Sequence, residues 1–436
     1  MIKKIQQDFS YYSHEFKDNY RKGVHRLRTI LASRAQAQAF VSNAGGTAVV
    51  LGYEPDTPDK NAQELYALLA ASPYIDNAVQ TFLGSIYEAG AESQDAMYSD
   101  SARCLEILHD PVMSRAAGAG TVSAGKWIAT LAGQSCNLYR DMNAVAASDI
   151  AMTAVAASET AMEAVISGTI ALNAVAASKT AMTAVAANET AMAAVAASRV
   201  AMSAIIGNST ALNAVVTSSV AMAAVIGNST ALNAVVSSST AMAAVAASYV
   251  AVAAVYGSAV AVDAVKANET AWATLTGATS AVMGKAVAVL SGLNPDSYAD
   301  MTAVASSSTA MAAIIGNSTA LNAVVSSSTA MAAIASSSTA LSAIAASTTA
   351  LNAIYAKKKR MSGASASLSG KFIILQISND NAFDTSKYGY ATLSDGSKPK
   401  WDSYKDKYAY FKQYKKIATY MKNDTDSDDW IDYFQC

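Results

Sequence analysis

The chain has 436 residues, a formal net charge of −2 and only 15% charged residues. A nucleic-acid-binding protein needs a basic field, so this balance excludes nucleic acid as a partner. The cysteines, Cys104, Cys136 and Cys436, are odd in number and lack CxxC spacing, which excludes a disulfide framework and a zinc site.

Neither a signal peptide nor a membrane span is expected. The first residues lack the apolar core of a signal peptide. Ser, Thr or Asn interrupts every long apolar stretch, so no segment is apolar for long enough to cross a membrane. We therefore expect the protein to be made in a cytoplasm.

Residues 1–117 have an ordinary composition and predict an α-rich N-terminal domain. We expect helices over residues 8–37, 59–72 and 73–87, and a strand over residues 47–51. At the end of a repeat protein, such a domain suits attachment to a support, although a capping role alone would also explain it.

The pattern Gly-Ala-x5-Gly-Lys occurs three times, over residues 118–126, 277–285 and 363–371. An apolar run follows each lysine and predicts a strand, so we expect small β-rich modules over residues 118–140 and 277–300. The first copy fits most of a phosphate-binding loop, but Trp127 stands where that loop requires Ser or Thr. We therefore reject phosphate binding there.

A ten-residue repeat, typified by Ala-Met-x-Ala-Val-Ala-Ala-Ser-x-Thr, fills residues 141–276 and 301–356. Met152 and Val155, with their counterparts in each repeat, form apolar columns at helical spacing. Ser158 stands at an N-cap position, and Gly207 followed by Asn208 combines a helix stop with a helix start. The repeats therefore predict two-turn helices separated by tight turns.

A continuous helix fits the repeat poorly, because ten residues at about 100° each leave the apolar stripe about 80° short of whole turns. The alternative is a β-solenoid, which the high alanine content disfavours. Helices this short need stacking on neighbouring repeats or on other chains, and the low charge favours burial in an oligomer. The expected fold is an elongated repeat protein, mainly of short α-helices, assembled as an oligomer.

Residues 357–436 form a C-terminal domain in which aromatic residues are crowded. We expect a strand over residues 372–375 and an amphipathic helix over residues 401–421. Aromatic side chains beside charged ones suit recognition of sugars or proteins, and the alternative is an aromatic core that trimerises and caps the repeats. The acidic run at residues 424–429 lacks the Gly and Glu of a calcium loop, so neither a metal nor a cofactor is expected. The candidate recognition or docking residues are Tyr404, Tyr408, Tyr410, Trp430, Tyr433 and Phe434.

The repeats, such as SSSTAMAAI at residues 306–314, together with the Gly-Lys modules, resemble those of tailed-bacteriophage fibre and whisker proteins over residues 118–378. The resemblance implies a homotrimeric virion protein, made in the host cytoplasm and attached to tail, baseplate or collar proteins by its N-terminal domain. The C-terminal end would contact a host surface glycan or protein, or dock another fibre protein. The short C-terminal domain departs from fibres that carry a large receptor-binding tip.

Other classes of protein fit less well. A bacterial surface adhesin would need a secretion signal, and an ice-binding solenoid would need a uniform threonine column, which Ile150 and Val200 interrupt. An enzyme such as a depolymerase would need paired acids in a cleft, whereas the arrays contain almost none, and no nucleophile motif is present. We therefore expect a structural protein and not an enzyme.

Overall fold

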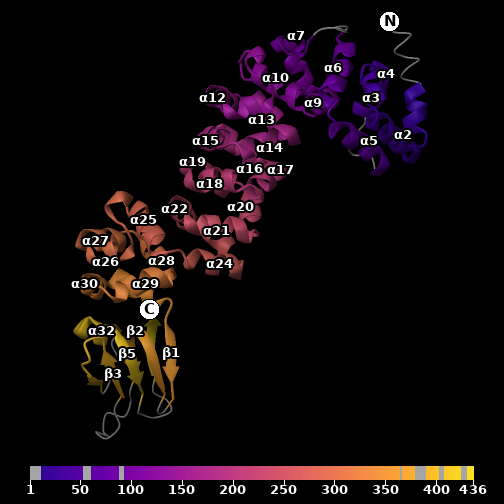
Figure 1. Ribbon diagram of the computed structural model, residues 1–436. Coiled ribbons are helices and arrows are strands. Elements are labelled where there is room, and N and C mark those ends of the chain that lie inside the picture. The colour runs from indigo at the N-terminus through magenta and orange to yellow at the C-terminus, as the bar shows by residue number, and fades with distance from the viewer. Residues whose placement is uncertain are drawn as a thin grey trace. The chain divides into compact units, whose positions relative to one another are not determined.

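The computed structural model (Figure 1) describes residues 11–52, 60–87, 93–363, 366–378, 389–401, 407–423 and 430–436. The chain divides into two compact units, Met1–Ala234 and Val235–Cys436. The first unit holds the N-terminal domain and most of the first repeat array. The second unit holds the end of that array, the second array and the C-terminal domain.

The described part of the N-terminal domain is helical. The helix expected over residues 8–37 is divided twice in its described part, by a turn at residues 18–19 and at Ser33, whose extended backbone separates α2 from α3. Residues 8–10 lie outside the described residues. Residues 11–17 are helical, and they are followed by α2 (Tyr20–Ala32), α3 (Arg34–Val41), α4 (Ala44–Leu51), α5 (Lys60–Ala70), α6 (Ile75–Ile86), α7 (Gln94–Tyr98), α8 (Ser101–His109) and α9 (Pro111–Ala117).

The strand expected over residues 47–51 is wrong, because these residues lie in α4. Asn43 caps the helix by accepting a hydrogen bond from the Gly46 N–H at 2.8 Å, and the Thr47 hydroxyl donates to the Asn43 carbonyl at 3.1 Å. Residues 49–51 are buried. A helix that is buried on most sides lacks regular polar positions, so its pattern does not differ from that of a buried strand.

The first two Gly-Lys modules are also helical, so the strands expected after Lys126 and Lys285 are wrong. The long helix of each module, Thr121–Leu131 and Ser280–Leu290, ends in the same way. Gly133 and Gly292 adopt φ +71°, and the N–H of the residue after each glycine donates at 2.8 Å to the carbonyl five residues before it. This ending requires left-handed backbone, which glycine adopts freely. The first module comprises α10 (Thr121–Leu131), the short turn η1 (Cys136–Leu138) and α11 (Met142–Ala147), and the second comprises α25 (Ser280–Leu290), η2 (Pro295–Ser297) and α26 (Met301–Ser306).

Each repeat forms one short helix, as predicted, and the β-solenoid alternative is wrong. The Ser158 N–H donates to the Val155 carbonyl at 3.1 Å, and its Oγ accepts from the Ala161 N–H at 3.2 Å. One extended residue thus ends one helix and begins the next. In nine pairs of consecutive helices, the second is bent from the first by 89–106°.

The repeat helices cover both arrays. Those of the first array are α12 (Asp149–Ala157), α13 (Glu159–Ser167), α14 (Thr169–Ala177), α15 (Lys179–Ala187), α16 (Glu189–Ala197), α17 (Arg199–Ile206), α18 (Ser209–Thr217), α19 (Ser219–Gly227), α20 (Ser229–Val236), α21 (Ser239–Ala247), α22 (Tyr249–Gly257), α23 (Ala259–Lys266) and α24 (Glu269–Thr276). Those of the second array are α27 (Ser308–Gly316), α28 (Ser318–Ser326), α29 (Ser328–Ala335), α30 (Ser338–Ala346) and α31 (Thr348–Tyr355).

Within each unit, most of the short helices pack on the helix three positions earlier. In the first unit α12 contacts α15 and α15 contacts α18, and in the second unit α22 contacts α25 and α25 contacts α28. Cap hydroxyls join successive coils, because the Ser178 Oγ donates to the Ala146 carbonyl and the Ser218 Oγ to the Ala186 carbonyl, each at 2.5 Å. The arrays are therefore α-solenoids with three repeats per coil, and the second Gly-Lys module continues the coil.

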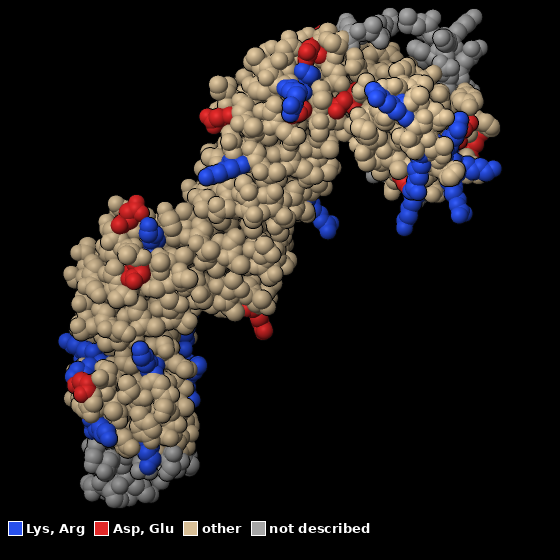
Figure 2. Space-filling model, in the orientation of Figure 1, with Lys and Arg blue, Asp and Glu red and all other residues tan. Residues whose placement is uncertain are grey.

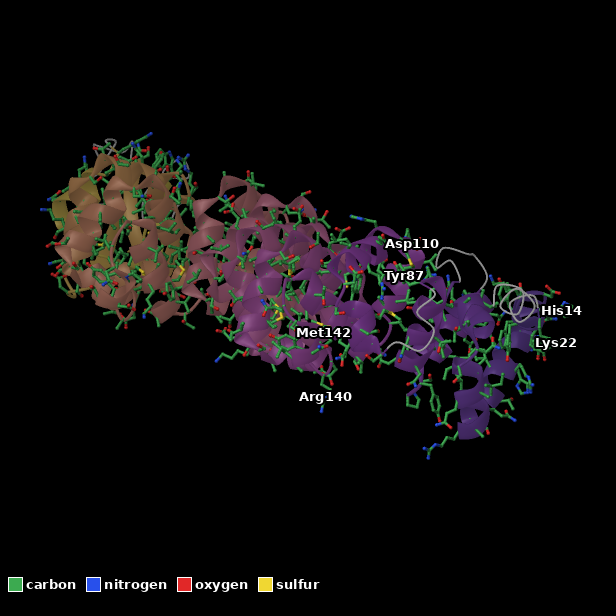
Figure 3. All side chains as sticks on the ribbon, turned by 90° about the horizontal axis from the view of Figure 1, so that it is seen from above. His14, Lys22, Tyr87, Asp110, Arg140 and Met142 are labelled. Carbon is green, nitrogen blue, oxygen red and sulfur yellow. The ribbon has the colours of Figure 1, made fainter. Side chains whose placement is uncertain are left out.

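The apolar columns of the repeats are buried inside the chain. Met142 and Val145 are 0% exposed, whereas the Arg140 side chain is 86% exposed, and Figure 3 shows it at the outer edge of the array. The expectation of an oligomer rests on the need to bury these columns, whereas the homotrimer is what the resemblance to fibre proteins implies. Stacking of helices within one chain meets that need, so burial no longer argues for an oligomer. The homotrimer stays a prediction.

Charged side chains are sparse on the arrays. In the view of Figure 2, Lys, Arg, Asp and Glu gather mainly on the N-terminal helices and on the C-terminal sheet. Among the described residues, no single helix has the length and apolar character needed to cross a membrane, although nine bent helix pairs would qualify by length and composition.

The C-terminal domain is a six-stranded antiparallel sheet in the order β1-β6-β2-β5-β3-β4. The strand expected over residues 372–375 is confirmed. The helix expected over residues 401–421 is wrong apart from one short helix, because residues 418–421 pair with neighbouring strands. The elements are β1 (Lys359–Ser362), β2 (Ser367–Ser378), β3 (Gly389–Leu393), β4 (Lys400–Trp401), α32 (Ala409–Tyr414), β5 (Ala418–Lys422) and β6 (Trp430–Gln435).

Candidate recognition surface on the C-terminal sheet

Most of the aromatic residues expected to be exposed are buried, which corrects the sequence-based assignment. Tyr408 is 6% exposed, Tyr410 2%, and Tyr433 and Phe434 7% each. Trp430 is partly exposed. Tyr404 lies outside the described residues.

Tyr410 and Tyr433 belong to the core of the sheet. They pack in one cluster with Phe372 and Met421, and the rings of Phe372 and Tyr433 meet edge to face with their centroids 5.2 Å apart. Two of the six candidate residues are therefore part of the core of the sheet domain. This agrees with the aromatic core of the alternative interpretation, whose trimerisation stays a prediction.

Tyr408 joins the sheet to the last repeat helix. Its backbone has φ +68°, its N–H donates to the Leu375 carbonyl at 2.5 Å, and its hydroxyl donates to Asn352 Oδ1 at 2.6 Å. Its ring meets that of Tyr355 edge to face at 5.7 Å. Because Asn352 and Tyr355 lie on α31, Tyr408 holds the sheet against the end of the array.

A buried carboxylate lies at the same junction. The Asp432 side chain is 0% exposed and forms ion pairs with Lys358 and with Arg360, whose Nε lies 2.6 Å from Asp432 Oδ1. The Tyr355 hydroxyl donates to Asp432 Oδ2 at 3.3 Å. Burial alone would raise the pKa of Asp432, but hydrogen bonds and charges from Arg360 and Lys358 lower it below its ordinary value.

Of the candidate residues that the structure describes, Trp430 is the one that is partly exposed. The guanidinium carbon of Arg360 lies 3.7 Å from the centroid of the Trp430 ring, which is a cation–π contact. Because the same guanidinium binds Asp432, the indole position is linked to the buried ion pair.

Sequence reasoning missed a pair of tyrosines on one face of the sheet. Tyr390 and Tyr420 are half-buried, and their ring centroids lie 5.7 Å apart. In the sheet register Tyr390 pairs with Lys422, and Thr392 pairs with Tyr420. The alternation of apolar and polar residues in β3 and β5 indicates strands whose tyrosines share one face. We did not use this pattern in β5, because we expected residues 401–421 to be helical. This face offers aromatic rings, hydroxyls and a cation for noncovalent recognition.

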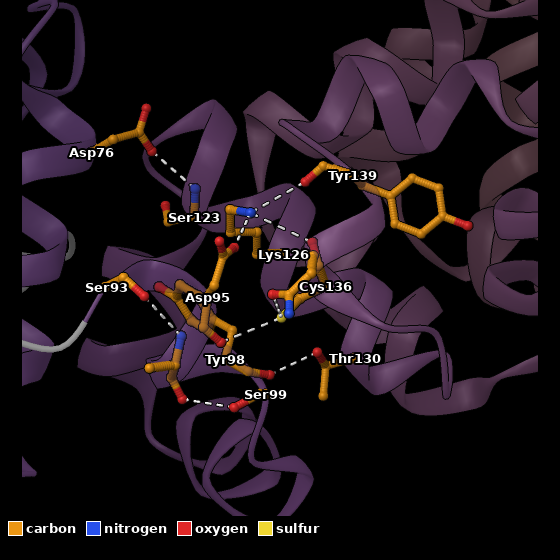
Figure 4. Close-up of polar contacts among 12 residues, drawn as sticks. Asp76, Ser93, Asp95, Tyr98, Ser99, Ser123, Lys126, Thr130, Cys136 and Tyr139 are labelled. Carbon is orange, nitrogen blue, oxygen red and sulfur yellow. Dashed lines mark hydrogen bonds and ion pairs between the residues drawn. The ribbon is translucent and has the colours of Figure 1, made fainter.

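The segment that resembles a phosphate-binding loop, residues 118–126, makes structural contacts instead (Figure 4). Lys126 is 8% exposed, pairs with Asp95, and donates to the carbonyls of Cys136 at 3.4 Å and Tyr139 at 3.3 Å. The first amides of α10, which a phosphate would need, instead donate to the Asp76 carboxylate, with Ser123 N–H at 2.9 Å. The lysine therefore holds the module together.

No protein-family model matches the chain, and no curated protein is significantly similar to it in sequence.

Proposed function

We propose that this protein is a structural component of a bacteriophage virion, namely the shaft of a tail fibre or a whisker. Its N-terminal domain attaches to tail, baseplate or collar proteins. Its C-terminal sheet presents Trp430, and separately the face that holds Tyr390 and Tyr420, to the host surface or to another fibre protein. The arrays serve as the spacer.

One observation carries the spacer role: the side chains of the repeat are used to stack one coil on the next. Ala151, Met152 and Val155 are each 0% exposed, and the corresponding columns are buried in both arrays except at Val262 and Trp272, which are partly exposed. Cap hydroxyls bind carbonyls of the previous coil. A further coil would present the same surfaces again, so such an array can grow without new chemistry. This is the property expected of an element that sets length.

The location of the protein can be tested with purified virus particles. Antibodies against residues 11–117 and against residues 357–436 are applied to particles in immunogold electron microscopy, with preimmune serum as the control. We expect the first antibody to label near the particle body and the second to label a projection. A protein that is found only in the soluble lysate and never on particles would refute the proposal.

The homotrimer has its own test. Light scattering on the full chain should give three times the 44.9 kDa mass of one chain if a fibre-like trimer forms. A monomer would refute the trimer but not the particle location, because the solenoid buries its apolar columns within one chain.

A further inference from the structure

The second unit contains a cavity of about 440 Å³ on the side of its solenoid. It lies among α22, α23, α24 and α28, with Lys357 just after α31. Its size falls in the range of pockets for small organic ligands, about 300–1,000 Å³. Its main side chains are Tyr256, Lys266, Trp272, Asn322, Ser326 and Lys357.

The residues that line this cavity are departures from the repeat. In the column of Tyr256 and Lys266, the other repeats of the first array carry Ala, Val, Ile or Thr. In the column of Trp272, most repeats carry Met or Leu. Repeats this uniform need no such residues to stack. Their concentration around one cavity therefore indicates that these residues serve the cavity and not the stacking of the coils.

Two cations border the cavity. The Lys266 ammonium lies 5.3 Å from the centroid of the Trp272 ring, and the Lys357 ammonium donates to Ser326 Oγ at 2.5 Å. Neither lysine has an acidic partner among the residues that the structure describes. Burial, and secondarily the charge of Lys266, lower the pKa of Lys357. An anion between the two ammonium groups would relieve this repulsion.

The cavity wall also contains an unsatisfied hydroxyl. Tyr256 is 6% exposed, and its buried hydroxyl has no hydrogen-bond partner among the described residues. Its ring meets that of Trp272 edge to face, with the centroids 6.4 Å apart. Buried hydroxyls are normally paired, so an isolated one beside a cavity indicates a place for a polar ligand atom or an ordered water.

We propose that this cavity binds an acidic saccharide unit, with its carboxylate between Lys266 and Lys357 and its ring against Trp272. Asn322, Ser326 and Asp263 supply hydrogen-bonding groups for the sugar hydroxyls. The two cations select for the acid, and the apolar indole selects for a ring over a free inorganic ion. The site lies within the second unit, so it would bind ligand whether or not the protein belongs to a virion.

The test is calorimetric titration of the full chain with galacturonate, with galactose as the neutral match and inorganic phosphate as the bare anion. We expect galacturonate to bind at least tenfold more tightly than either control. Equal binding of galactose, equal or tighter binding of phosphate, or no binding of galacturonate would overturn the proposal.

Substitutions locate the binding. Lys266→Met combined with Lys357→Met should abolish galacturonate binding, and Trp272→Leu, which restores the repeat residue, should weaken it at least tenfold. The first unit supplies a matched control, a groove of about 430 Å³ lined by Lys179, Thr183 and Asn213 without an aromatic residue. Lys179→Met should leave the affinity unchanged. Unaltered binding in the folded double variant, or loss of binding in Lys179→Met, would refute the assignment.

Discussion

At the residue scale, the cap positions of the repeat perform two separate tasks. Each Ser or Asn cap of the arrays accepts a hydrogen bond from the start of its own helix, whereas Gly168 at the same position has no side chain to do so, and only some caps also reach the previous coil. The Ser218 Oγ accepts from the Ala221 N–H and donates to the Ala186 carbonyl. The Ser198 Oγ accepts from the Ala201 N–H, and the described residues show no bond from it to another coil.

This difference predicts unequal costs for the same substitution. Ser198→Ala removes a cap and should destabilise the protein by about 1 kcal/mol. Ser218→Ala should cost about 2 kcal/mol, because it also leaves a carbonyl without its partner. Urea unfolding followed by circular dichroism at 222 nm measures both values. Equal costs would show that the bond to the previous coil contributes nothing.

The helix stop at Gly207 does not use the freedom of glycine. Gly207 has φ −76°, and Asn208 supplies the cap by accepting from the Thr210 and Ala211 amides at 2.9 and 3.2 Å. The expected pair of stop and start signals is therefore confirmed for Asn208. It is confirmed for Gly207 as well, because α17 ends at Ile206 with Gly207 as its C-cap, although the residue keeps right-handed backbone.

The ion pair around Asp432 predicts an acid-sensitive C-terminal domain. The pKa of Asp432 is lower in the folded state than its unfolded value of 3.8. The pair therefore contributes its full stability above about pH 4 and loses it as the pH falls through the folded pKa. Asp432→Asn should lower stability by about 2 kcal/mol at pH 7 and have little effect at acid pH below the folded pKa. Thermal melts followed by tryptophan fluorescence at both pH values would test this, and an equal effect at both would contradict it.

At the element scale, the Gly-Lys modules depend on one close approach. A Cβ on Gly125 would lie 2.4 Å from the Asp141 carbonyl carbon, and one on Gly284 would lie 2.4 Å from that of Asp300. The glycine therefore lets the long helix contact the start of the first helix that follows it. This contact explains why Gly-Lys and the later Asp-Met recur together at fixed spacing.

Substitution of these glycines should accordingly be costly. Gly125→Ala and Gly284→Ala should each destabilise the protein by about 3 kcal/mol, because backbone atoms occupy the required space. Gly227→Ala and Gly316→Ala are matched controls, since nothing lies within 4 Å of a Cβ at either position. These controls should be neutral or stabilise by up to about 1 kcal/mol. Differential scanning calorimetry separates the two classes, and similar melting temperatures for all four variants would refute the close-contact explanation.

At the scale of the whole molecule, coils of three repeats make the array modular. Deletion of residues 179–208 removes three repeats and joins Ser178 to Ser209, so every remaining helix keeps a partner three positions away. Deletion of residues 179–183 instead leaves half a repeat, which is too short to form a helix between two caps.

The deletions give a direct measure of the coil. Loss of residues 179–208 should leave a folded protein and shorten the distance between spin labels at Thr153 and Ala223 by about 8–10 Å, the spacing of packed helices. Both labelled positions are exposed. Loss of residues 179–183 should lower the melting temperature of the array. An unchanged label distance after the longer deletion, or an unchanged melt after the shorter one, would argue against stacking of every third helix.

The sequence by itself determined the parts of this protein that depend on neighbouring residues. Met152 and Val155 at helical spacing, followed by a cap such as Ser158, specify a short helix through contacts within one repeat. Tertiary structure decided the rest. Residues 127–131 are helical, although a similar apolar run at 372–375 is a strand. Local sequence could not distinguish the two, because a segment buried on most sides lacks the polar positions that reveal its period. Which tyrosines stay at the surface depended on strand register and on contact with α31, and these long-range partners leave no local trace in the sequence.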